Sequence, residues 1–285
     1  MLDLSQELID HIIDHLDDRD VFTIKGCSLV SRAFARRSRA RLFAYIRRKV
    51  IPDENEHLLE ECLRGSAAMR GKLSVPCAAD LVQNIELCGD YLRPAPRMTT
   101  ATLRRILSYV PRLRRFQLHN FCMDRDEESD CDPPLGRARL ELEELDLRLD
   151  FRTTIGLIRV LRIFSRTTCL RLRQIVSREA ADFPQAQEEV EAEIARVAEQ
   201  CPLDLRVTQL ELYLWQIGPV CLELLKRAAY KSGVAVRDVR IRCDSGQRNF
   251  ELLGAFFSDK KISACVNHVT MVYPFYGEWS YVTCL

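Results

Sequence analysis

The stretch Leu142-Glu143-Glu144-Leu145-Asp146-Leu147 decides the fold, because its spacing of apolar residues recurs along most of the chain. The pattern is an apolar residue, two others, a second apolar residue, any residue and a third apolar residue. Alternation over the last three positions is typical of a β-strand with one buried face. The copies are Val82-Ile85-Leu87, Leu113-Phe116-Leu118, Leu142-Leu145-Leu147, Thr167-Leu170-Leu172, Val207-Leu210-Leu212, Val236-Val239-Ile241 and Val266-Val269-Met271.

The copies follow one another at a period near 30 residues. From Ile85 onward their middle residues are 31, 29, 25, 40, 29 and 30 residues apart. Helical patterns fill the intervals: Thr99 or Thr100 precedes one that ends before Pro111, and others lie at 155–163, 191–199 and 222–230. A unit of one strand and one helix buries its apolar face only by stacking on its neighbours. We therefore predict an irregular α/β solenoid with a parallel sheet and about seven units, and a doubly wound sheet is the alternative.

The first fifty residues follow a different pattern. The net charge of +1, from 42 basic and 41 acidic residues, hides seven acids and one base in residues 3–20, and nine bases and no acid in residues 21–49. Apolar residues recur every fourth position from Leu4 to Leu16, which predicts an amphipathic helix, and later apolar positions predict one or two further short helices. We place a helical docking motif at 1–48, a linker with a first cap helix at 49–76, and the solenoid at 77–285.

These residues resemble a known family. The run Leu4-Ser5-Gln6-Glu7-Leu8, then Ile12, Leu16, Asp20-Val21 and the run 28–34, resembles the F-box, the N-terminal motif of substrate receptors in SCF-type ubiquitin ligases. The resemblance covers about residues 3–45; Ser5 and Asp18 stand where proline is common, and Phe34 where tryptophan is expected. The repeats resemble the divergent leucine-rich-repeat-like regions that follow F-boxes in many fungal proteins. The resemblance implies packing within the motif and against a Skp1-like adaptor by Leu4, Leu8, Ile12, Leu16, Val21, Val30 and Phe34.

The strand pattern also predicts a binding face, because strand side chains alternate between the two faces of a sheet. Residues that flank the apolar positions line the exposed face, where arginine and tyrosine are typical of protein interfaces. We predict contacts to a target protein from Arg115, Gln117, His119, Asp146, Arg148, Arg171, Arg173, Tyr213, Arg240 and Arg242. This face is mixed in charge, so we expect no nucleic acid there, and a solvated face without a ligand is the alternative.

Motifs for catalysis, metals and phosphates are incomplete. His11 and His15 have the spacing of a zinc pair but lack the glutamate between them, and the acidic run 124–135 lacks the glycine and the closing carboxylate of a calcium loop. The segment 65–72 has glycines too far apart for a phosphate loop, and the twelve cysteines form no CxxC pair. We therefore predict no enzyme activity, no cofactor and no metal, with an enzyme of unrecognised type as a remote alternative.

These observations together predict a non-catalytic adaptor. The N-terminal helices would dock a Skp1-like protein, and the solenoid would hold a target protein not identified by the sequence. The alternative is a leucine-rich-repeat-like interaction scaffold with no ligase role, or, for the first helices alone, a simple cap on the following domain. The sequence has no long apolar stretch and no signal-peptide pattern, so we expect an intracellular protein, cytoplasmic or nuclear, that does not bind a membrane.

Overall fold

The computed structural model describes most of the N-terminal two thirds of the chain and several later strands. The described residues are 4–17, 20–51, 57–72, 76–90, 94–124, 140–151, 155–177, 205–213, 238–242, 268–275 and 278–284, with single residues at 254, 258, 260 and 266. The helices are α1 (Gln6–Asp14), α2 (Val21–Val30), α3 (Arg32–Ala44), α4 (Leu58–Ala68), α5 (Ala78–Leu81), α6 (Thr100–Ser108) and α7 (Ile155–Leu161). The strands are β1 (Tyr45–Val50), β2 (Asn84–Gly89), β3 (Arg97–Thr99), β4 (Arg115–Asp124), β5 (Leu140–Phe151), β6 (Phe164–Ser177), β7 (Arg206–Tyr213), β8 (Asp238–Arg242), β9 (His268–Phe275) and β10 (Glu278–Cys284).

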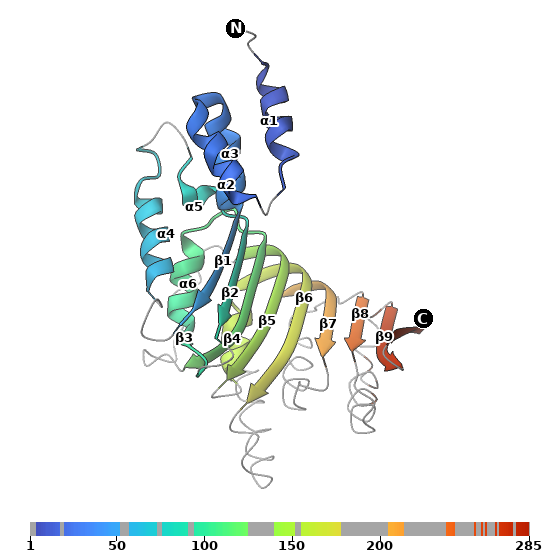
Figure 1. The fold of residues 1–285 in the computed structure, drawn as a ribbon. Coiled ribbons are helices and arrows are strands. Elements are labelled where there is room, and N and C mark those ends of the chain that lie inside the picture. The colour runs from blue at the N-terminus through green and yellow to red at the C-terminus, as the bar shows by residue number, and fades with distance from the viewer. Residues whose placement is uncertain are drawn as a thin grey trace.

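All the described strands belong to one curved sheet (Figure 1). Its order is β1-β2-β4-β5-β6-β7-β8-β9-β10, which is the order of the strands in the chain, and the short β3 pairs with β4. Every pairing is parallel except that of β9 with β10, which is antiparallel. The α/β class with a parallel sheet is therefore confirmed. A doubly wound sheet reverses its strand order at a switch point, and the described strands contain no such reversal.

The apolar repeats lie in register across the sheet. The middle residues of the seven copies pair one with the next, so that a single apolar row crosses seven neighbouring strands: Ile85, Phe116, Leu145, Leu170, Leu210, Val239 and Val269. All of these are buried except Val269, which is partly buried against the same core. The alternation read from the sequence thus corresponds to one buried face of the sheet, where apolar area is removed from water.

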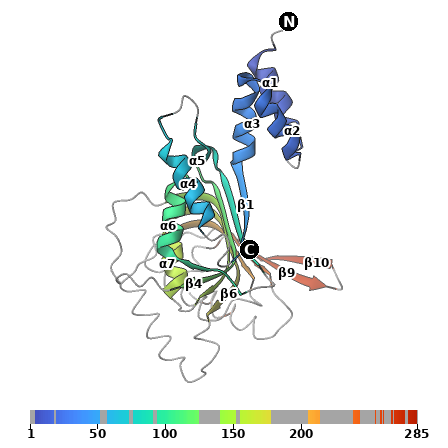
Figure 2. The same cartoon turned by 60° about the vertical axis from the view of Figure 1, so that its left-hand side comes forward.

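Helices cover that buried face, and the opposite face is open among the described elements. Figure 2 shows α4, α5, α6 and α7 on the same side of the sheet. Helix α6 begins as the sequence predicts, with the Thr99 hydroxyl accepting a hydrogen bond from the Thr102 amide at 3.1 Å. It contributes Leu103, Ile106 and Leu107 to the core. The helices predicted at 191–199 and 222–230, and most of the acidic run 124–135, lie outside the described residues.

Strand β1 is a feature that the sequence pattern did not indicate. Helix α3 runs into it at Tyr45, and β1 pairs in parallel with β2 along its whole length. The boundary placed at residue 48 therefore falls inside a strand, and the basic residues Arg47 and Lys49 belong to the sheet. Three of residues 45–50 are basic, which suits an edge strand, and Val50 is the only buried residue among them.

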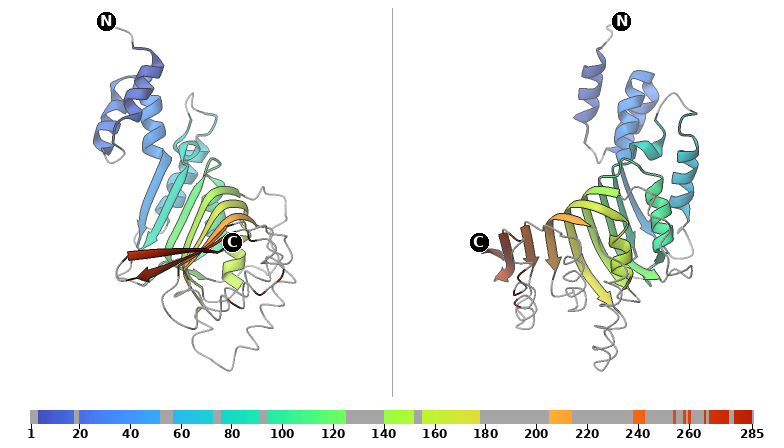
Figure 3. Two further views of the ribbon diagram at one scale, coloured as in Figure 1. Left: turned by 90° about the vertical axis from the view of Figure 1, so that its right-hand side faces the viewer. Right: turned by 180° about the vertical axis from the view of Figure 1, so that it is seen from behind.

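Strand β1 forms one edge of the sheet, and the three N-terminal helices project past the start of this strand (Figure 3). The antiparallel pair of β9 and β10 forms the opposite edge. Within these helices the buried apolar residues are Ile9, Ile13 and Ile24. Across the described residues, no helix combines the length and apolar character needed to cross a membrane.

Candidate protein-interaction surfaces

Helix α1 is held on α3 by polar contacts as well as by Ile9 and Ile13. The Arg37 guanidinium donates from Nε and Nη2 to the two carboxylate oxygens of Asp14, at 2.7 and 2.6 Å. This hydrogen bonding, more than the charge alone, holds the pKa of Asp14 below its ordinary value. Arg41 donates to the backbone carbonyls of Ile13 and Leu16 at the end of α1, where a cation is favourable because the carbonyl end of a helix carries partial negative charge.

The same helices expose many apolar side chains. Among the predicted adaptor-binding residues, Leu4, Leu8, Ile12, Val21 and Val30 are each 46–72% exposed, whereas Leu16 and Phe34 are half-buried. Two neighbours absent from that set are more exposed still: Phe22 at 89% and Leu29 at 81%. We call the exposed residues together the N-terminal apolar surface: Leu4, Leu8, Ile12, Val21, Phe22, Leu29 and Val30. Exposed apolar side chains gathered on one small unit are typical of interaction sites.

The open face of the sheet carries charged side chains in register. One row, which we call the charge row, crosses seven strands and consists of Arg47, Glu86, Gln117, Asp146, Arg171, Glu211 and Arg240. Acids and bases in this row lie within contact distance on neighbouring strands. Cross-strand pairs of opposite charge stabilise a sheet, so the row contributes to the fold as well as to the surface.

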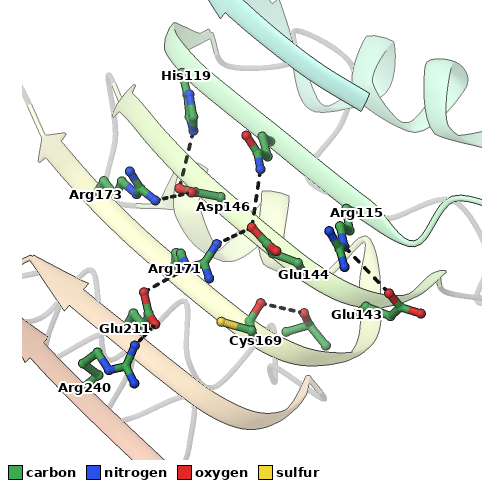
Figure 4. A network of polar contacts seen from close by, with 12 residues as sticks. Arg115, His119, Glu143, Glu144, Asp146, Cys169, Arg171, Arg173, Glu211 and Arg240 are labelled. Atoms are coloured by element: carbon green, nitrogen blue, oxygen red, sulfur yellow. Dashed lines mark hydrogen bonds and ion pairs between the residues drawn. The ribbon is translucent and has the colours of Figure 1, made fainter. Parts of the chain in front are cut away.

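Hydrogen bonds and ion pairs connect side chains of the open face in two groups, and Glu211 lies at the centre of the first group. Its Oε2 accepts a hydrogen bond from Arg171 Nε at 2.9 Å, and its Oε1 accepts one from Arg240 Nη1 at 3.1 Å (Figure 4). Arg171 also donates to Glu144, which accepts a further hydrogen bond from Gln117 at 3.4 Å. The result is a continuous polar chain from β4 to β8 that orients the two arginine side chains.

Asp146 lies at the centre of the second group of polar contacts on the open face. Its Oδ2 lies 2.8 Å from Arg173 Nη2, and its Oδ1 lies 3.5 Å from His119 Nε2 (Figure 4). The Arg173 guanidinium in turn lies over the Tyr213 ring, 5.1 Å from its centroid. The alternation pattern places Asp146 among the target contacts, but only 2% of its side chain is exposed, because Arg173 and His119 cover it. Asp146 therefore orients its neighbours and does not present its carboxylate to solvent.

The remaining predicted target residues lie on the same strands. Arg115 is exposed and paired with Glu143 at 3.8 Å, Arg148 is half-buried, and Arg242 lies opposite Tyr213 in the strand register. Tyr45, Arg47 and Lys49 reach the open face through β1, which adds side chains that the sequence assigned to the docking motif and its linker. The alternate positions of Tyr45, Arg47 and Lys49 are the sequence feature from which a strand with these side chains on one face could have been predicted.

Glu86 receives polar contacts from three side chains at the β1 end of the face. It accepts hydrogen bonds from the Tyr45 hydroxyl and, at 3.3 Å, from the Cys88 thiol, and it lies 3.1 Å from Arg47 Nε. Burial opposes ionisation of this carboxyl, but these contacts together hold its pKa below the ordinary value. Burial and the hydrogen bond to Glu86 raise the pKa of Tyr45 to about 12.

Comparison with known proteins assigns no family. A scan against protein-family models, a search of curated proteins and a search of solved structures each gave no match to the chain. The interpretation of its surfaces therefore rests on their own geometry and chemistry.

Proposed function

We propose that this protein is a non-catalytic substrate-recognition subunit of an SCF-type ubiquitin ligase. Its N-terminal helices would dock a Skp1-like adaptor, and the open face of a leucine-rich-repeat-like solenoid would bind a target protein. The observation that carries the proposal is the N-terminal apolar surface, because five residues that the F-box resemblance assigns to the adaptor are solvent-exposed. A helical unit with only three buried apolar residues is better explained by a partner than by its own core.

The sheet supports the target-binding half of the proposal. Parallel strands in chain order, with a period near 30 residues, are the arrangement expected of a solenoid, whose open face is an extended binding surface. Arg171 is held by Glu144 and Glu211, and Arg173 is held by Asp146, so these side chains lose little conformational freedom when a target binds. Because acids and bases alternate, the face suits a protein of mixed charge better than a polyanion.

The mechanism would be proximity. A receptor that binds adaptor and target at once holds target lysines near the ubiquitin-charged enzyme, which raises their effective concentration without any catalytic group in the receptor itself. The polar chain on the sheet face would contribute selectivity, since a partner that places like charges against its arginines and glutamates would be repelled.

The test is co-purification of the full chain with a Skp1-like adaptor. Leu8→Asp combined with Ile12→Asp places two charges in the proposed interface, and two substitutions of about 2 kcal/mol each weaken binding about 1000-fold. Leu58→Asp is the matched control, since Leu58 is 45% exposed at the start of α4, outside the N-terminal helices. We expect the double variant to lose the adaptor and the control to keep it.

Equal adaptor recovery from the double variant and the parent chain would reject the docking proposal. The second candidate function, a leucine-rich-repeat-like interaction scaffold without a ligase role, draws on the open face alone. It predicts that the full chain captures a target in cells while no Skp1-like protein is recovered with it. The same pulldown therefore separates the two functions.

A further inference from the structure

Three side chains with metal-ligating atoms meet on the open face near its β1 edge. Glu86 and Cys88 lie two residues apart on β2, and His119 is the register partner of Cys88 on β4. One carboxylate oxygen, the thiol sulfur and one ring nitrogen all lie within 4.8 Å of one another, and all three residues are half-buried. The Cys88 sulfur lies 3.3 Å from Glu86 Oε1 and 3.9 Å from His119 Nδ1.

These separations suit one tetrahedral ion. With Zn–S about 2.3 Å and Zn–N or Zn–O about 2.0–2.1 Å, ligand sulfur lies about 3.5–3.6 Å from ligand nitrogen or oxygen. The observed distances of 3.3 and 3.9 Å differ from this by a few tenths of an ångström. The Glu86 oxygen and the His119 nitrogen lie within 4.8 Å of each other, and rotation of their side chains would have to bring them to about 3.3–3.4 Å to complete the site. A thiolate with an imidazole favours zinc and related transition metals over magnesium or calcium.

The second nitrogen of His119 already has the partner that metal-bound histidines use. Nε2 lies 3.5 Å from Asp146 Oδ1, and neither of these buried atoms makes a hydrogen bond within normal limits. A carboxylate at Nε2 favours the proton on that nitrogen, which leaves the Nδ1 lone pair directed at a metal. Without an ion, His119 is a half-buried imidazole whose two nitrogens both lie at least 3.5 Å from their partners.

The backbone beside these residues is shaped to bring the two strands together. Asn120 has a φ of 58°, in the left-handed region, and lies where the β4–β5 register shifts between His119 and Phe121. Its side chain donates to the Asp90 carbonyl at 3.0 Å. Gly89 follows Cys88, and a Cβ there would lie 2.1 Å from the Asn120 carbonyl oxygen. Such bulges, and glycines at close backbone approaches, re-aim the neighbouring side chain.

We propose that Glu86, Cys88 and His119 bind a divalent transition-metal ion of the zinc type, with Asp146 as a positioning residue for His119. The ion replaces the thiol proton, which passes to solvent, and no oxidation or reduction is involved. Metal binding would break the contact between Arg47 and Glu86 Oε1. The Arg47 side chain is 70% exposed, so its guanidinium can rotate away and be solvated by water. The fourth coordination position faces the open side of the sheet, where water or a side chain of a bound protein can occupy it.

This inference does not depend on the adaptor function, and its test uses no ligase component. The full chain, stripped with a chelator, is titrated with Co²⁺, whose complexes with thiolate show a charge-transfer band and whose tetrahedral sites show strong visible absorption. We expect one ion per chain and a thiolate band. Cys88→Ser removes the band, whereas Cys62→Ser, at an exposed cysteine on α4, keeps it.

Two milder variants guard against misfolding of Cys88→Ser. Glu86→Gln keeps the side-chain shape and is expected to weaken Co²⁺ binding, and Asp146→Asn is expected to weaken it about 10–100-fold through His119 while leaving the thiolate band in place. Circular dichroism checks that each variant is folded. Absence of a thiolate band in the parent chain, its survival in Cys88→Ser, or unchanged affinity in Glu86→Gln would each overturn the proposal.

Discussion

Replacement of Glu211 by glutamine tests whether the polar network on the open face stabilises the sheet. Glu211 is 4% exposed, and each of its oxygens accepts a hydrogen bond from a different arginine, Arg171 on β6 and Arg240 on β8. Glutamine keeps the side-chain shape and one acceptor oxygen. The amide nitrogen of glutamine is a donor, so one of the two arginines would meet a second donor in place of an acceptor. The substitution would also remove the negative charge with which both arginines interact.

The expected loss in the free energy of unfolding is estimated from one lost hydrogen bond. A hydrogen bond to a charged group contributes about 1.5–3 kcal/mol net, and a buried donor left without its partner adds to the cost. Arg240 is 42% exposed on its side chain and can turn to water, which reduces that cost. We expect the free energy of unfolding to fall by about 2 kcal/mol, which corresponds to about 30-fold faster exchange of amides that open with the sheet.

Glu143→Gln is the matched control. Glu143 also lies beside two arginines, with Arg114 Nη1 at 3.4 Å and Arg115 Nε at 3.8 Å, but all three side chains are more than half exposed. Solvent screens such pairs, so we expect a change below about 0.5 kcal/mol. The assay is urea denaturation followed by circular dichroism, with hydrogen exchange of β6, β7 and β8 measured by mass spectrometry.

Equal effects of the two substitutions would refute the reasoning, because Glu211 differs from Glu143 in being buried and in accepting two shorter hydrogen bonds from its arginines. A Glu211→Gln chain that unfolds within about 0.5 kcal/mol of the parent would refute it as well, since the buried carboxylate would then contribute no more than an exposed one.

Three further predictions follow from single sites. Gly89→Ala should destabilise the sheet by about 1–3 kcal/mol in urea, because the added Cβ meets the Asn120 carbonyl; an unchanged midpoint would contradict the close approach. Because its arginine partner lowers the pKa of Asp14, that contact stabilises α1 above pH about 4 and is lost as pH falls through the lowered pKa. Amide exchange in α1, corrected for its intrinsic pH dependence, should therefore accelerate on acidification in the parent chain, and Asp14→Asn should remove this response. Burial raises the pKa of Cys169 to about 11, so alkylation at neutral pH should label exposed Cys62 and spare Cys169, as mass spectrometry of the labelled chain would show.

Much of the sheet could be predicted because it depends on local alternation. The spacing of Leu142, Leu145 and Leu147 marks a strand with one apolar face, and its copies mark the neighbouring strands without any knowledge of contacts. Strand β1 could not be predicted in this way. Residues 45–50 carry little apolar alternation, and they become a strand because the edge of β2 offers backbone partners that only the folded sheet supplies.

Some residues of the candidate sites could likewise be predicted from local periodicity, whereas others depend on tertiary packing. The exposed residues of α1 follow from a helical period of about 3.6, so Leu8 and Ile12 could be selected from sequence, whereas Phe22 and Leu29 required the packing of α2 on α3 to be identified as exposed. Burial of Asp146 could not be foreseen, because side chains of strands β4 and β6 cover it.

By itself, then, the sequence determined the α/β class, the repeat length and which strand residues face the core, since each depends on periodicity within a few residues. Only the tertiary structure decided which charged side chains meet. The ligand atoms of Glu86, Cys88 and His119 converge because parallel pairing places β2 beside β4, 31 residues later in the chain at the Cys88–His119 pair. The same pairing rule sets Glu211 between two arginines that are 40 and 29 residues away in sequence.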